Sequence, residues 1–147
     1  MRRLSLALVV AVVAVGLAAC GGSGHKSTTD STAAAQDQIR SAYEQFFSAS
    51  TPLTDRVAVL QDGSRFKKVV ASFASNPLAK NVHVTVSSVG VQGGSKAKVV
   101  YTVKFGNTSL GKQTGTAVLQ NGTWKVGFAG LCKLVALSGT TPSACKS

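Results

Sequence analysis

The fold is decided by residues 82–126, which read VHVTVSSVGVQGGSKAKVVYTVKFGNTSLGKQTGTAVLQNGTWKV. Apolar and polar side chains alternate along much of this stretch, as they do in a β-strand with one buried face. Glycine-containing turns at 93–95 and 106–107 divide it. The pair Asn121-Gly122 favours a two-residue hairpin, because both central residues of that turn need positive φ. The stretch therefore predicts four consecutive antiparallel strands.

The part of the chain before these strands has helical periodicity. Apolar side chains recur over 35–47 at spacings of three and four residues, which predicts an amphipathic helix. Pro52 interrupts the pattern, because the residue before a proline is driven out of the α region. We expect a short second helix over 53–60 and a third helix that Ser64 caps and Pro77 ends.

The end of the chain completes the fold class. We expect the fourth strand to carry Trp124, Val126 and Phe128 on its inward face, and a short C-terminal helix to follow around 131–135. Helices followed by an antiparallel meander make an α+β domain. The expected architecture over 33–147 is a single domain in which N-terminal helices pack on a curved four-stranded antiparallel sheet, as in cystatin-like cone folds.

The N-terminus indicates export. Two arginines follow Met1, residues 4–17 are uncharged and mostly apolar, and small residues come next, which is the layout of a secretory signal peptide over 1–19. A membrane-spanning helix is the alternative. The apolar run, however, gives way to a polar stretch after Cys20 without a basic stop-transfer cluster.

The residues Leu17-Ala18-Ala19-Cys20 resemble a bacterial lipobox, in which the cysteine thiol carries a diacylglycerol and becomes the mature N-terminus. A diacyl anchor with chains such as palmitate is durable, since each buried methylene contributes ~0.8 kcal/mol. Plain cleavage after Ala19 is the alternative. The Gly, Ser and Thr residues of 21–32 predict a flexible linker between lipid and domain. We therefore expect a lipid-anchored protein on the outer face of the cell membrane.

The other two cysteines, Cys132 and Cys145, form an even pair in an oxidising compartment, so we expect a disulfide between them. In the chain-entropy model, a disulfide that closes a loop of this length stabilises the folded state by ~3 kcal/mol. The alternative is a reactive thiol at Cys132. That thiol would need a nearby base, and the histidines of the chain are His25 and His83.

The distribution of charge disfavours an enzyme. The chain has a formal net charge of +11, and residues 63–147 contain eleven Lys or Arg and no carboxylate. Glycosidases need two carboxylates, hard-metal sites need several oxygen anions, and zinc sites need His and Cys ligands. We expect no cofactor, no metal site and no catalysis in the sheet. An enzyme would have to take its acid from the helices, through Glu44, Asp55 or Asp62.

Basic side chains suggest a binding face. By the period-two count Lys98, Lys104 and Lys125 lie on the outward face of adjacent strands, with His83 beside them. Such a face can bind anionic envelope polymers, phospholipid headgroups or an envelope protein, whereas export removes nucleic acid from the expected partners. The alternative is that the lysines only keep the sheet soluble and discourage edge pairing.

Aromatic residues allow a second kind of binding. Tyr43, Phe47, Tyr101 and Trp124 are expected between the first helix and the sheet. They could line a cone-shaped pocket in which the protein carries an apolar small molecule. The alternative is that these rings simply fill the core.

Three short motifs carry a family resemblance. They are 60–63 (LQDG), 121–126 (NGTWKV) and 132–134 (CKL). On these motifs the span from about residue 39 to 137 resembles the C-terminal domain of the mycobacterial low-molecular-weight secreted antigen family. The resemblance implies an exported actinobacterial protein of cone-like α+β fold with no established catalytic residues. The lipobox and the cysteine in the tail depart from that family's pattern, so here we expect retention on the membrane.

Overall fold

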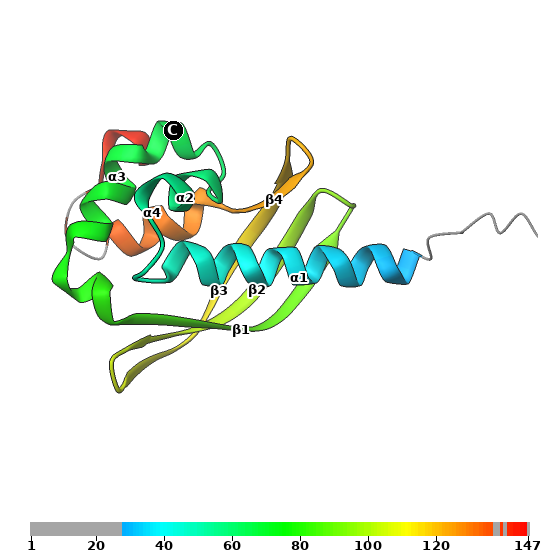
Figure 1. Ribbon diagram of the computed structural model, residues 1–147, viewed down its shortest axis with the longest axis horizontal. Coiled ribbons are helices and arrows are strands. Elements are labelled where there is room, and N and C mark those ends of the chain that lie inside the picture. The colour runs from blue at the N-terminus through cyan, green and yellow to red at the C-terminus, as the bar shows by residue number, and fades with distance from the viewer. Residues whose placement is uncertain (1–27, 137–138, 140, 147) are drawn as a thin grey trace, which may run out of the picture.

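A long N-terminal helix, α1 (Thr28–Phe47), lies across one face of a four-stranded sheet (Figure 1). The computed structural model describes residues 28–136, 139 and 141–146. The remaining helical elements are α2 (Leu53–Ala58), α3 (Gly63–Ser75), the 3₁₀ turn η1 (Pro77–Asn81), α4 (Phe128–Ala136) and the 3₁₀ turn η2 (Ser143–Cys145). The strands are β1 (Val82–Gln92), β2 (Lys96–Phe105), β3 (Thr108–Gln120) and β4 (Thr123–Val126). The expected α+β class is confirmed, with helices, a curled antiparallel sheet and a short C-terminal helix.

The sheet has the order β1-β2-β3-β4, and every neighbouring pair is antiparallel. Its register shifts twice, between Val86 and Ser88 on β1 and between Thr102 and Lys104 on β2. An extra residue in one strand of a pair bends that strand and increases its twist. The two irregularities therefore help the sheet to curl around α1.

The core lies between α1 and the inner face of the sheet. Alternate residues of β2 from Ala97 to Val103 are buried, as the period-two pattern predicts. They meet the buried face of α1, and each large side chain that is fully buried contributes roughly 1.5–3 kcal/mol. The largest buried side chains of the described residues include Ile39, Tyr43, Phe46, Phe66 and Leu60.

Both terminal strands are covered. On β4, the N–H of Val126 donates to the carbonyl oxygen of Val59 and the N–H of Gln61 donates back to that of Val126, each at 2.8 Å. On β1, the side chains of Gln36 and Arg40 in α1 donate to two carbonyl oxygens of the strand. These contacts occupy backbone groups that would otherwise invite another chain to pair.

Two boundaries differ from expectation at the helices. Ser64 does not cap α3; the N-cap is Asp62, whose φ is +50° and whose side chain makes no capping hydrogen bond. The Asp62 carboxylate instead accepts a hydrogen bond from Nε2 of Gln120, at 2.6 Å. Helix α2 ends at Ala58 rather than at 60, because Leu60 forms a bridge with Val126 of β4.

Two further differences lie at the ends of the predicted elements. Phe128 belongs to α4 and not to β4. Pairing with β3 ends at Gly127, whose N–H donates to the carbonyl oxygen of Thr116, and the ring of Phe128 stacks on Phe66 of α3. Helix α1 begins at Thr28, so residues 28–32 of the expected linker are helical; the alanines that follow favour propagation of the helix toward its N-terminus. The predicted signal peptide, Cys20 and residues 21–27 lie outside the described residues.

Candidate functional site

The structure places Lys98 and Lys104 on the exposed face of β2, opposite to the face that α1 covers. Lys104 stands directly across from His83 on β1, and Lys98 stands across from Thr116 on β3. The two lysines are six residues apart on one strand, which separates their Cα atoms by roughly 20 Å. Exposed charges are largely screened beyond about 8 Å at physiological salt. They therefore act as separate charges and do not form one continuous stripe.

A tighter group of cations lies at one end of this face. Val118 on β3 pairs with Lys96 of β2 on one side and with Lys125 of β4, which is half-buried, on the other. Lys98 is the next residue after Lys96 on the same face of β2. We call Lys96, Lys98 and Lys125 the lysine cluster. Lys96 was not predicted from the sequence, although the same period-two count, extended by one step before Lys98, leads to it.

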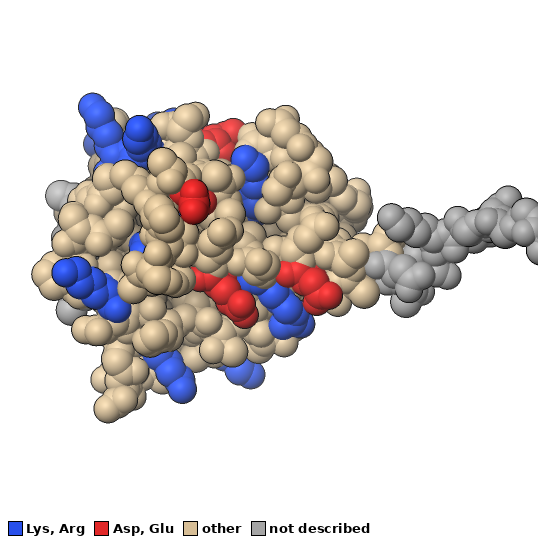
Figure 2. All heavy atoms as spheres, in the orientation of Figure 1, with Lys and Arg blue, Asp and Glu red and all other residues tan. Residues whose placement is uncertain are grey.

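No carboxylate lies on the outer face of the sheet among the described residues. The acids are confined to α1, α2 and the turn before α3. Figure 2 looks onto the α1 side of the molecule and shows acidic side chains there. The described acids therefore lie on the helical side, where Figure 2 shows them among basic side chains, whereas the lysine cluster lies on a face with no described carboxylate.

An apolar pocket of about 380 Å³ lies at the end of the molecule where α1 stops and α3, η1 and α4 gather (Figure 1). Its floor, which we call the pocket floor, consists of the buried side chains of Phe47, Val69, Ala79, Val82 and Val103. Its rim, the pocket rim, consists of Ser72, Asn76, Leu110 and Pro142. The walls are completed by Phe73, Phe105, Leu134 and Val135.

The rim contains an exposed apolar residue. Leu110 on β3 is 46% exposed although it lines the pocket. It lies next to Gly111, whose φ of +76° accompanies the irregular pairing of β2 with β3. The hairpin thus presents a large hydrophobic side chain at the mouth of the pocket instead of burying it.

The expected disulfide holds another part of the rim. Cys132 of α4 and Cys145 of η2 are bonded, with their Cα atoms 5.6 Å apart. The bridge ties the C-terminal segment that contains Pro142 to α4, which itself contributes Leu134 and Val135 to the pocket. The cross-link therefore positions Pro142 of the pocket rim relative to the wall that α4 contributes.

The aromatic residues expected to line a pocket separate into two sets. Phe47 lies in the pocket floor, whereas Tyr43, Tyr101 and Trp124 are packed in the core and do not line it. The rings of Tyr43 and Tyr101 are 5.2 Å apart, and Oη of Tyr43 donates to the carbonyl oxygen of Thr116 at 2.8 Å. Burial raises the pKa of both phenols, and the neighbouring Tyr101 raises that of Tyr43 further. Tyr43 is therefore a neutral hydrogen-bond donor.

The acids considered for catalysis are all exposed. Glu44, Asp55 and Asp62 lie at the surface, and none of them lines the apolar pocket. Within the part of the chain that the structure describes, no three His, Cys, Asp or Glu side chains are placed to hold a metal ion. Over residues 28–136, 139 and 141–146, no helix has the length and apolar character needed to cross a bilayer.

Comparison with known proteins identifies one family. The family model described as low molecular weight antigen MTB12, C-terminal domain, matches residues 32–142. The matched span covers every strand and helices α2 to α4, together with most of α1. No curated protein matches the chain.

Proposed function

The chain belongs to the family of the low molecular weight antigen MTB12 C-terminal domain, and from this membership we propose that it is an exported binding protein of the cell envelope. The leader-like residues 1–19 support export, and the lipobox ending at Cys20 supports a lipid anchor on the outer face of the membrane. The exposed positions of the acids, outside the pocket, favour binding over catalysis.

The anchor is tested by Cys20→Ala. We expect the wild-type protein to partition into the detergent phase and the variant to move to the culture fluid, because the sulfur that carries the lipid is gone. Mass spectrometry of the wild-type N-terminus checks the modification directly. An unmodified Cys20, or unchanged fractionation of the variant, would contradict the anchor.

The folded domain binds an anionic envelope surface through the outer face of its sheet. The single observation that carries this proposal is the lysine cluster on a face with no described carboxylate. A basic side chain close to an anionic membrane surface contributes about 1 kcal/mol. Three such side chains suffice to orient a domain that a lipid already holds, and they are too few to hold it alone.

Binding to vesicles tests this role. The Cys20→Ala protein should bind phosphatidylglycerol-containing vesicles at low salt, release them as salt rises, and ignore neutral vesicles. The triple variant Lys96→Gln, Lys98→Gln and Lys125→Gln should lose most of the binding. The matched control is Lys67→Gln, Lys133→Gln and Lys146→Gln, which removes the same charge from exposed positions outside the lysine cluster. Equal losses of vesicle binding in the two triple variants would mean that only the net charge of the protein matters, and not the lysine cluster.

The apolar pocket favours a second function, that of a carrier for an apolar small molecule. Ligand pockets are typically concave, mostly apolar and roughly 300–1,000 Å³ in volume, and this pocket meets all three criteria. Copurification of lipid with the folded chain tests the carrier function without any assumption about the ligand's headgroup.

A further inference from the structure

We propose that the apolar pocket binds the hydrocarbon chain of a single anionic amphiphile, of which a long-chain fatty acid is the simplest member. The inference rests on the carrier function proposed above and adds the chemical class of the ligand. Three properties of the pocket carry it: the apolar lining, the volume, and the charge around the rim.

The lining suits a hydrocarbon and does not suit ordered water. Every member of the pocket floor is apolar and at most 8% exposed. Ser72 and Asn76 are the polar side chains among the described lining residues, and both belong to the rim. A buried water needs two to four polar partners, which the floor does not offer. The interior therefore favours methylene groups over water.

The volume sets the length of the chain. An apolar cavity of roughly 150 Å³ holds one benzene ring in a well-studied engineered protein. By that scale the 380 Å³ of this pocket accommodates about fifteen carbon atoms. One acyl chain of ordinary length fits this space, whereas a diacyl lipid would leave its second chain outside.

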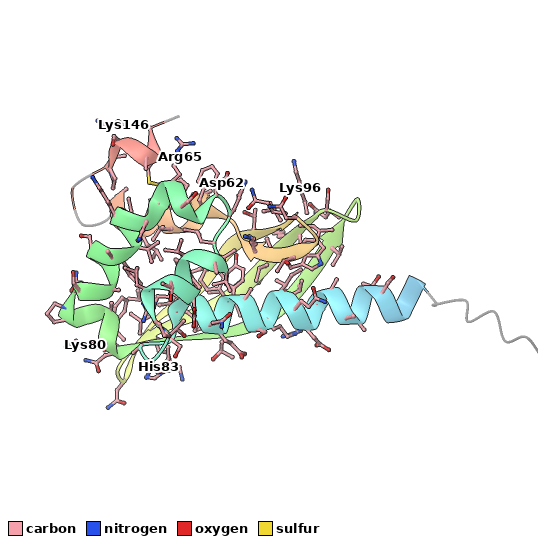
Figure 3. The ribbon with its side chains drawn as sticks, turned by 45° about the horizontal axis from the view of Figure 1, so that its top comes forward. Asp62, Arg65, Lys80, His83, Lys96 and Lys146 are labelled. Atoms are coloured by element: carbon pink, nitrogen blue, oxygen red, sulfur yellow. A yellow bond between two sulfur atoms is a disulfide. The ribbon has the colours of Figure 1, made fainter. Side chains whose placement is uncertain are left out.

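The charge around the rim selects the headgroup. Apart from Phe47, all of the lining comes from residues after 63, a part of the sequence with no carboxylate. Lys68 precedes Ser72 by one turn of α3, and Lys80 directly follows Ala79 of the pocket floor where η1 continues from α3 (Figure 3). An anionic headgroup at the rim would thus meet two flanking cations, and none of the described lining residues is acidic.

Calorimetric titration of the Cys20→Ala protein, which has no lipid of its own at that position, tests the ligand class. The probes are saturated fatty acids of increasing length and the primary alcohols of equal length, below their micellar concentrations. We expect affinity to rise about threefold to fourfold per methylene and to level off near about fifteen carbons. Each acid should bind about tenfold tighter than its alcohol, and Lys68→Gln with Lys80→Gln should abolish that difference.

A rim substitution separates failure of the ligand class from failure of the carrier function. Ser72→Trp places a large ring at the mouth and should abolish binding without disturbing the core, because Ser72 is exposed. Ser64→Trp is the control, since Ser64 is exposed on the same helix and does not line the pocket. If acids and alcohols bind with equal affinity, the proposal that the ligand is anionic is overturned, whereas the carrier function stands. No binding of either probe, or undiminished binding by Ser72→Trp, would overturn the carrier function as well.

Discussion

Gly115 of β3 is a position where the core has no room for a side chain. A Cβ built there would lie 2.5 Å from Oη of Tyr43 and 3.0 Å from a ring carbon of Tyr101. We expect Gly115→Ala to lower the free energy of unfolding by about 1–3 kcal/mol, as overpacked cores generally do. Urea denaturation with an unchanged m-value measures the loss.

The control for this substitution is Gly90→Ala. Gly90 is exposed on β1, and a Cβ there would meet nothing within 4 Å. The change should therefore stay within about 0.5 kcal/mol. Equal losses at the two positions would mean that the close approach to Tyr43 does not constrain Gly115.

Because Tyr43 and Tyr101 are buried, we expect the folded state to lose stability at alkaline pH. Burial raises the pKa of Tyr43 and of Tyr101, whereas tyrosines of the unfolded chain ionise near pH 10. The contribution of the two protonated phenols to the free energy of unfolding is therefore fully present below about pH 10. It is lost as pH rises above about 10 and through the higher pKa values of the folded state. Each tyrosine should contribute a slope of up to about 1.4 kcal/mol per pH unit in that range.

Tyr43→Phe isolates one of the two contributions. At neutral pH the variant should lose only about 0.5–1.5 kcal/mol, because the oxygen of Thr116 keeps the hydrogen bond from the N–H of Gly127 at 2.7 Å. Its alkaline slope should be about half that of the wild type. Tyrosinate absorbance that rises near pH 10 while the chain is still folded would contradict the prediction.

Arg56 shows what a residue pattern cannot predict. Its side chain is only 3% exposed, and it donates hydrogen bonds to the carbonyl oxygens of Ser48 and Thr51, which follow the end of α1. Its Nη1 has no partner among the described residues, and burial lowers its pKa. A positive charge is favourable near the C-terminus of a helix. Sequence periodicity does not predict this, since an arginine in α2 is ordinarily expected on the surface.

Among the elements, those whose pattern is local were predictable. The Asn121-Gly122 turn is confirmed by positive φ at both residues, 52° and 74°. The alternation of β2 is confirmed by its burial. Phe128 continued the same alternation and yet begins a helix, in which its ring stacks on Phe66 of α3, a contact that only the tertiary fold creates. The apolar pocket was not predictable, since its lining runs from Phe47 to Pro142 and only the tertiary fold brings these residues together.

The C-terminal segment depends on its cross-link. We expect replacement of both Cys132 and Cys145 by serine to lower the free energy of unfolding by about 2–4 kcal/mol, mainly by freeing the unfolded chain. Fatty-acid affinity should fall as well, because Pro142 would no longer be fixed at the pocket rim. Thermal unfolding and titration of the double variant measure both effects. A variant with lower stability and unchanged affinity would show that the disulfide does not shape the pocket.

At the scale of the whole molecule, α1 separates the proposed anchor from the pocket. Its 20 residues span about 30 Å. The pocket includes Phe47 at the C-terminal end of this helix, whereas the proposed tether joins at Thr28. The pocket is therefore remote from the proposed point of attachment. At that position it is accessible to a ligand that another molecule or membrane holds.

The lysine cluster predicts how the domain is oriented at an anionic membrane. The lysine cluster lies on the outer face of the sheet, and three of the acids lie on α1 against the other face. An anionic membrane attracts the lysine cluster and repels the carboxylates of α1, so the sheet should turn toward the lipid. A fluorescent label on Thr114→Cys, at the exposed centre of the sheet face, should become shielded from an aqueous quencher when anionic vesicles are added.

A label on Gln45→Cys, exposed on α1, should remain accessible. Salt should remove the difference between the two labels, because it screens the attraction. Equal shielding of the two labels would mean that the domain has no preferred face, in which case the lysines serve only solubility.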